Sequence, residues 1–104
     1  MDGDFFDALS NPYRRQIVRM LKWGNYSVNE ITKALEISQP SVSRHLDVLK
    51  KANLVVAERR ANQIIYSLNL SVMQEFVGKM VEFLDDMKDS HEQNSDLLMR
   101  LYNK

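Results

Sequence analysis

Residues 27–52 read SVNEITKALEISQPSVSRHLDVLKKA and predict two helices joined by a very short turn. Ser27 and Glu30 match a capping box, in which the serine and glutamate side chains satisfy two backbone N–H groups reciprocally. Ser38 is placed to cap the second helix, and Pro40 falls in its first turn, where a missing N–H does no harm. Two capped helices with so short a connection predict a helix-turn-helix.

Apolar side chains recur at helical spacing through both halves of this stretch. In the second helix, Val42, Leu46 and Leu49 fall within about 80° of one another on a helical wheel and form its inner stripe. Ile37 lies in the turn and is predicted to be buried between the two helices. We therefore expect a steep crossing held by Ile31, Leu35, Ile37, Val42 and Leu46.

Two helical segments precede the helix-turn-helix. Asp4–Leu9 predicts a short helix. Asn11-Pro12 is a helix start, with asparagine as the N-cap and proline at the first helical position. This second helix is expected to stop near Trp23-Gly24-Asn25.

The hydrophobic period changes from helix to strand after the helix-turn-helix. Leu54–Arg60 and Gln63–Asn69 are rich in β-branched residues and are separated by Ala61-Asn62, which predicts a hairpin. The helical period returns from Ser71, and a break is expected at Asp89-Ser90 before a last apolar segment.

This order of elements is that of a winged helix-turn-helix, a mainly helical α+β fold, followed by an extra long helix. The chain has 104 residues, 44% of them hydrophobic and 27% charged, which is typical of one folded domain. Within the single domain 1–104, residues 11–70 form the predicted DNA-binding core, with the wing at 54–69. Residues 1–10 and 71–104 supply flanking helices that are predicted to dimerise.

The formal net charge of zero hides an uneven distribution of charge. Residues 11–70 hold ten bases and four acids, a net charge of +6. Residues 1–10 hold three acids and no base, and residues 71–104 hold four bases and seven acids, so each flank carries −3. Such asymmetry says more about partners than the isoelectric point does, and it favours an anionic partner for the middle block.

The outer face of the second helix of the pair carries small polar side chains and one arginine. Gln39 and Ser41 lie in its first turn, where residues of a recognition helix reach base edges. Glutamine pairs with adenine and arginine with guanine through two hydrogen bonds, while serine is permissive. An ordinary solvated face would look the same, and without the neighbouring motif the two interpretations have equal weight.

Basic pairs at the end of this helix and at the hairpin tip support the DNA interpretation, because phosphate contacts supply most of the non-specific affinity. Charged side chains on a strand edge also protect against aggregation, so no single one of them is diagnostic. The predicted contacts to double-stranded DNA are Gln39, Pro40, Ser41, Ser43, Arg44, His45, Lys50, Lys51, Arg59 and Arg60.

Composition excludes several classes of function. The chain has no cysteine, which excludes disulfide frameworks, zinc fingers and cysteine nucleophiles. Its apolar runs are far too short to cross a bilayer, and its acidic start is unlike a signal peptide, so we expect a cytoplasmic protein. His45 and His91 lie far apart in the sequence, and no nucleophile, phosphate loop or carboxylate pair indicates an enzyme or a cofactor.

Three ordered motifs resemble the ArsR/SmtB family of prokaryotic repressors. Residues 8–17 (ALSNPYRRQI) resemble the family's opening, residues 37–46 (ISQPSVSRHL) its recognition helix, and residues 65–68 (IYSL) its second wing strand. The resemblance implies a dimeric winged-helix repressor that blocks its own or a neighbouring promoter. The chain departs from the family's pattern at two places. Glu36 replaces the usual turn glycine, and the wing turn Ala61-Asn62 lacks glycine.

The resemblance also implies where an inducer site would lie, and the sequence lacks the ligands for it. The family's thiolate sensors place cysteines on the third helix, and the corresponding Tyr26–Thr32 has none. Its zinc-type sites resemble Asp-x-His followed, after ten residues, by a second histidine; Asp89-Ser90-His91 matches the first half, but the later position is Tyr102. We therefore interpret His91 as a lone surface histidine and His45 as a packing or phosphate-contacting residue. No metal site is predicted, and control by an unidentified inducer or partner protein stays open.

The long helix that starts at Ser71 is interpreted as the dimer element, because its apolar residues recur at alternating three and four positions. The same stripe could instead cover the monomer's own core, with the apolar residues of the first helix as its partner. The resemblance likewise places dimer contacts on the first and last helices. The predicted interface consists of Phe5, Phe6, Leu9, Met73, Phe76, Val77, Met80 and Leu84.

The leading interpretation is a homodimeric, sequence-specific repressor that occupies a palindromic operator through residues 38–52 and 54–69. The alternative is a winged-helix module that binds proteins and not DNA. The basic block and the polar start of the second helix argue against this alternative.

Overall fold

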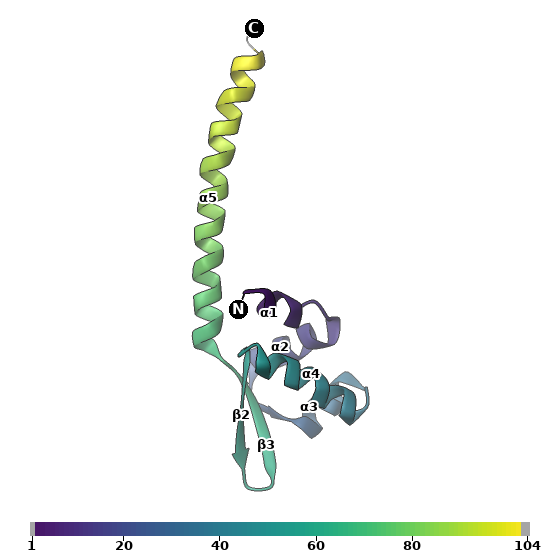
Figure 1. The fold of residues 1–104 in the computed structure, drawn as a ribbon. Coiled ribbons are helices and arrows are strands. Elements are labelled where there is room, and N and C mark those ends of the chain that lie inside the picture. Colours follow the sequence, from purple (N-terminus) through teal and green to yellow (C-terminus); the bar gives the residue numbers. More distant parts are fainter. Residues whose placement is uncertain (1, 103–104) are drawn as a thin grey trace. The chain divides into compact units, whose positions relative to one another are not determined.

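The computed structural model describes the backbone of residues 2–102 and the side chains of residues 4–88, 99 and 100. The chain forms two compact units, Met1–Val72 and Met73–Lys104. Figure 1 shows the helices and strands in chain order. They are α1 (Asp2–Ala8), α2 (Pro12–Trp23), β1 (Tyr26–Ser27), α3 (Val28–Leu35), α4 (Gln39–Lys51), β2 (Val55–Arg60), β3 (Gln63–Leu68) and α5 (Leu70–Tyr102).

The caps predicted for the helix-turn-helix, α3 and α4, are confirmed. Ser27 Oγ accepts a hydrogen bond from the backbone N–H of Glu30 at 3.2 Å, and Glu30 Oε1 accepts one from the Ser27 N–H at 2.9 Å. Ser38 Oγ accepts from the Ser41 N–H at 3.3 Å at the start of α4. These bonds satisfy N–H groups that a helix start leaves without an intrahelical partner, so each helix begins at a defined residue.

α2 begins, as predicted, with Asn11 as its N-cap. Asn11 Oδ1 accepts from the N–H groups of Tyr13 at 2.8 Å and Arg14 at 3.3 Å. The helix ends at Trp23, whose side chain is 80% exposed, with Lys22 Nζ lying 5.3 Å from the centre of its ring. The end of α2 is therefore an aromatic and basic surface and not part of the core.

The core of the first unit lies between α2, α3, α4 and the start of β2. Its largest fully buried side chains are Ile17, Ile31, Leu46, Leu49, Leu54 and Val42. The predicted inner stripe of α4 is thus confirmed. Ile37 is only half-buried, contrary to the prediction, because the turn between α3 and α4 runs at the surface, where the neighbouring Glu36 and Ser38 are exposed.

The predicted hairpin is confirmed, and β2 and β3 pair antiparallel along their whole length. Leu54 and Asn69, at its open end, fall outside the strands that we expected to include them. A strand that the sequence did not predict, β1, pairs with the other edge of β3, so that Tyr26 lies opposite Tyr66 in a three-stranded sheet. β1 has only two residues, which is too short for an alternation of polar and apolar side chains to be detected.

In the described part of the chain, three residues other than glycine adopt the left-handed backbone conformation: Glu36 at φ 56°, Asn53 at φ 61° and Ala61 at φ 53°. Two of them are the positions at which the sequence lacks the usual glycine. Glu36 ends α3, and its N–H donates to the Thr32 carbonyl oxygen at 3.0 Å. In this conformation Cβ comes close to the following carbonyl oxygen, which destabilises the fold by about 1–2 kcal/mol per residue.

α5 is one continuous helix, so the break predicted at Asp89-Ser90 is wrong. Aspartate and serine interrupt the apolar pattern, but unlike proline they keep the backbone N–H that the helix needs, and they lower its stability only slightly. Of its apolar side chains, Val77, Leu84 and Met87 are each more than half exposed. Within the described residues, no helix combines the length and the apolar character that a membrane span requires.

Replacing Glu36 by glycine is expected to stabilise the protein relative to replacing it by alanine. Both variants remove the carboxylate, but only alanine keeps a Cβ in the left-handed conformation. The free energy of unfolding should therefore be about 1 kcal/mol higher for Glu36→Gly than for Glu36→Ala. Urea unfolding followed by circular dichroism measures this difference. A glycine variant less stable than the alanine variant would show that position 36 stores no such strain.

Candidate nucleic-acid interface

Of the residues of α4 that were predicted to contact DNA, Pro40, Arg44 and Lys51 lie opposite its buried stripe, and the others lie at its flanks. The exposed members are Gln39, Pro40, Arg44, Lys50 and Lys51. The half-buried members are Ser41, Ser43 and His45. The face thus combines amide, hydroxyl and guanidinium groups, which pair with base edges, and ammonium groups, which pair with phosphates.

The first turn of α4 already uses part of its hydrogen-bonding capacity. The Ser41 hydroxyl accepts a hydrogen bond from Ser38 Oγ at 2.9 Å, while the Ser41 N–H donates to that same oxygen at 3.3 Å. A hydroxyl that accepts keeps its own hydrogen, so Ser41 remains a donor toward a bound molecule.

The hairpin carries two exposed arginines next to its turn. Arg59 and Arg60 lie opposite Ile64 and Gln63 in the ladder of β2 and β3. Arg60 Nη2 lies 3.4 Å from Glu58 Oε2, and the two side chains are 62% and 67% exposed. Water screens an ion pair this exposed, so Glu58 holds Arg60 only weakly. Arg60 can therefore leave Glu58 and pair with another anion.

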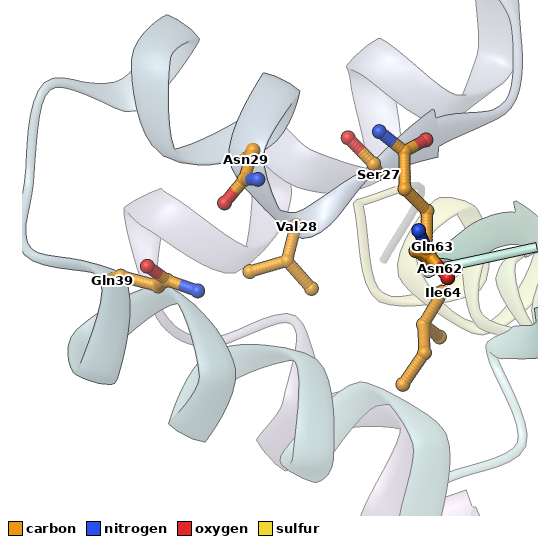
Figure 2. Close-up of a pocket in the computed structure, with 7 residues that line it drawn as sticks. All are labelled: Ser27, Val28, Asn29, Gln39, Asn62, Gln63 and Ile64. Atoms are coloured by element: carbon orange, nitrogen blue, oxygen red, sulfur yellow. The ribbon is translucent and has the colours of Figure 1, made fainter.

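A recess of about 200 Å³ lies where α3 begins, α4 begins and the hairpin turns. Figure 2 shows Val28 between Gln39 on one side and the residues of the hairpin turn on the other. Its polar lining consists of Ser27 and of amides from all three segments, namely Asn29, Gln39, Asn62 and Gln63. An amide offers both donors and an acceptor without a charge, so the recess suits a polar group of either kind.

Only Gln39 among these amides belongs to the predicted contact set. Asn29, Asn62 and Gln63 were missed because no local spacing links the first turn of α3 to the hairpin turn. The two-residue turn predicted at Ala61-Asn62 could have pointed to Asn62 and Gln63. The tip of a wing lies beside the recognition helix, so residues at the turn share a surface with that helix.

His45 turns from α4 toward α2. Its Nδ1 lies 3.2 Å from Arg14 Nη1, and its ring centre is 5.8 Å from that of Tyr13. Burial lowers the pKa of His45, and the positive charges of Arg14 and Arg44 lower it further. The imidazole is therefore neutral at pH 7, a state that suits packing between helices, one of the two roles considered for it above.

The residues predicted to form a dimer differ in how much surface they offer. Phe5 is buried, with 6% exposure, whereas Phe6 is 55% exposed. Val77 and Leu84 on α5 are also largely exposed. The half-buried members are Leu9, Met73, Phe76 and Met80. Phe6, Val77 and Leu84 therefore present the most apolar surface of the set.

Among the described residues, no three or more His, Cys, Asp or Glu side chains converge to hold a metal ion. The pattern Asp89-Ser90-His91 lies outside the described side chains.

Comparison with known proteins finds relatives of one kind. Residues 11–56 match the family described as "Bacterial regulatory protein, arsR family". The chain is 39% identical over 83 residues to the transcriptional repressor SdpR of Bacillus subtilis, and the match covers 80% of this chain and 92% of SdpR.

Solved structures confirm the predicted winged helix-turn-helix fold. HlyU from Vibrio cholerae is 30% identical, with a TM-score of 0.63, over 76% of this chain and 89% of HlyU. The structure described as the homodimeric winged helix-turn-helix DNA-binding domain of Mb0332 from Mycobacterium bovis, a possible ArsR-family regulator, is 28% identical. Its TM-score is 0.66, over 81% of this chain and 77% of that domain.

Proposed function

Because the chain belongs to the arsR family of bacterial regulatory proteins, we propose that it is a homodimeric, sequence-specific repressor of transcription. The observation that carries the proposal is the polar outer face of α4, whose first turn lies beside the wing. It lies in the stretch of chain that holds the positive charge, residues 11–70. SdpR is a transcriptional repressor and Mb0332 a possible transcriptional regulator. In this proposal the chain, like them, regulates transcription and acts on chromosomal DNA in the cytoplasm.

α4 supplies the direct readout of sequence in this proposal. Its N-terminal half enters the major groove, where Gln39 pairs with adenine and Arg44 with guanine. Lys50 and Lys51 at its C-terminal end contact phosphates and add affinity for any sequence.

The wing extends the contact along the duplex. Arg59 and Arg60 bind phosphates beside the recognition helix. Asn62 and Gln63 line the recess that also contains Gln39. The part of the DNA groove that lies between α4 and the wing would therefore meet uncharged hydrogen-bond donors and acceptors. Glutamine and asparagine side chains can hydrogen-bond to base edges as donors or as acceptors.

The exposed apolar face of α5 is the proposed dimer seam. Val77, Val81 and Leu84 recur on one face of the helix and are each more than half exposed. A second copy of the chain would cover them symmetrically. Two recognition helices related by a two-fold axis then require an operator with matching symmetry.

Duplexes selected from a random pool should contain two half-sites in inverted orientation. Their centres should lie about one helical turn, roughly 10–10.5 bp, or a multiple of it apart. Arg44→Ala should weaken binding to the selected duplex by about 1–3 kcal/mol and relax the base preference at one position. Arg19→Ala, which removes an exposed arginine of α2, is the matched control and should leave that preference intact.

Two outcomes would count against this assignment. Single half-sites bound as tightly as the pair would remove the dimeric mode of recognition. An equal loss on every sequence in Arg44→Ala would reduce that residue to a phosphate contact.

Operator affinity should not respond to zinc, nickel, cadmium or arsenite, because the chain has no cysteine and lacks the second histidine of the zinc-type pattern. Each ion is titrated into the preformed protein–DNA complex, with fluorescence anisotropy of the labelled duplex as the readout. Release of the duplex at a stoichiometric concentration of any one ion would overturn the prediction.

Leu84→Ala should weaken the dimer far more than Glu82→Ala, which truncates the opposite side of the same helix. Two leucines lost from a symmetric seam, at about 2 kcal/mol each, raise the dissociation constant roughly a thousand-fold. Sedimentation at low micromolar concentration measures the effect. A Leu84→Ala protein that stays as dimeric as the Glu82→Ala control would place the seam elsewhere.

A further inference from the structure

Side chains of α2 hold the C-terminal end of α1, since Arg15 Nη1 donates to the Leu9 carbonyl oxygen at 2.9 Å and Arg14 makes two further bonds. Arg14 Nε donates to the carbonyl oxygen of Ala8 at 2.6 Å, and Arg14 Nη2 donates to that of Asp7 at 3.1 Å. The last carbonyls of a helix lack intrahelical partners and carry partial negative charge, so a guanidinium is a favourable partner for them. Arg14 therefore fixes the end of α1 against the start of α2.

The same guanidinium reaches the recognition helix. Its third nitrogen, Nη1, lies 3.2 Å from Nδ1 of His45 on α4. A guanidinium has donors only, so this hydrogen bond exists only while Nδ1 of His45 carries no proton. Arg14 thus joins α1 to α4 through one planar group and requires one protonation state of the histidine.

The groups around His45 reinforce this requirement. α2 presents the Arg14 guanidinium and the Tyr13 ring to it, and the neighbouring charge on α4 itself is Arg44. A proton on Nδ1 would turn an attractive contact into one N–H facing another. It would also place a third positive charge beside two arginines in a partly buried site.

We propose that Arg14 and His45 are positioning residues for DNA recognition, which hold α4 in place against α1 and make operator binding depend on a neutral His45. The inference rests on the proposed function, since it concerns how α4 is presented to DNA. His45 directly follows Arg44 and lies one helical turn beyond Ser41, so a shift of its backbone displaces both of these predicted contacts.

The direction of the pH effect separates this role from a phosphate contact. If His45 positions α4, its protonation breaks the bond to Arg14, and operator affinity falls as the pH falls. If His45 binds a DNA phosphate, its protonation adds a favourable charge contact, and operator affinity rises as the pH falls. Burial and the charges of Arg14 and Arg44 hold the pKa of His45 below its ordinary value of about 6.5, so the bond is present at neutral pH and is lost as the pH falls through that lowered pKa.

The experiment measures the dissociation constant for the selected operator duplex at about pH 7.5 and about pH 5.5, at constant ionic strength. The wild-type protein should bind more weakly at the lower pH, by less than the roughly ten-fold loss that an unshifted pKa of about 6.5 would give, because the pKa of His45 is lowered. His45→Asn carries an acceptor that does not titrate, so its affinity should not change between the two. His91→Asn removes the only other histidine and should keep the wild-type profile.

Arg14→Gln tests the link from its other end. Glutamine keeps a donor for the carbonyls of α1 but removes the charge and cannot reach all three acceptors at once. We expect operator affinity to be lower at about pH 7.5 and no longer to fall at about pH 5.5. The pKa of His45, followed by NMR of its ring protons, should rise toward its ordinary value. Thermal unfolding of the variant shows whether the fold is retained, and the NMR titration needs no DNA.

The outcomes distinguish the two proposals. If the wild-type protein selects no duplex at any pH, the proposed function fails. If it binds its operator at about pH 7.5 and its affinity is flat or rises toward pH 5.5, the positioning role of Arg14 and His45 is overturned. A pKa of His45 that does not change in Arg14→Gln would overturn it as well.

Discussion

The burial of Val42, Leu46 and Leu49 against α2 and α3 is the constraint on which the rest of the interface depends. With this stripe inside, the helical period directs Arg44 outward, while Gln39 in the first turn of α4 is exposed beside α3 and the hairpin turn. Close packing of fully buried side chains permits little rotation of α4 about its axis. The buried stripe therefore fixes which face of α4 points outward, while the bond between Arg14 and His45 ties the helix to α2.

Around this core, hydrogen bonds from capping side chains fix where the helices begin, and the distribution of charge indicates which partner they bind. The capping box of Ser27 and Glu30 starts α3 at the rim of the amide-lined recess, so one local motif also places Asn29 beside the wing. The chain is neutral as a whole, yet its bases are concentrated between residues 11 and 70. Separation of charge along the chain allows a protein that is neutral as a whole to offer an anionic polymer a basic segment.

Local signals predicted the helix-turn-helix, its caps and the hairpin, because each depends on residues within a few positions of one another. Pairings between distant segments were not predictable in this way. β1 exists only because Tyr26 meets Tyr66, and the bond between Arg14 and His45 joins two motifs that the sequence treats as separate. The break expected at Asp89-Ser90 was wrong for the opposite reason, since a polar dipeptide alone does not end a helix whose backbone bonds continue through it.

The exposed indole at the end of α2 gives the protein an intrinsic fluorescent probe. Trp23 is the only tryptophan of the chain and is 80% exposed, so its emission in the native state is that of a solvated indole and changes little when the chain unfolds. The ammonium group of Lys22 beside its ring concentrates anions there and repels cations. Iodide therefore quenches this fluorescence more effectively than caesium does, and any molecule that covers the end of α2 shields the ring from both.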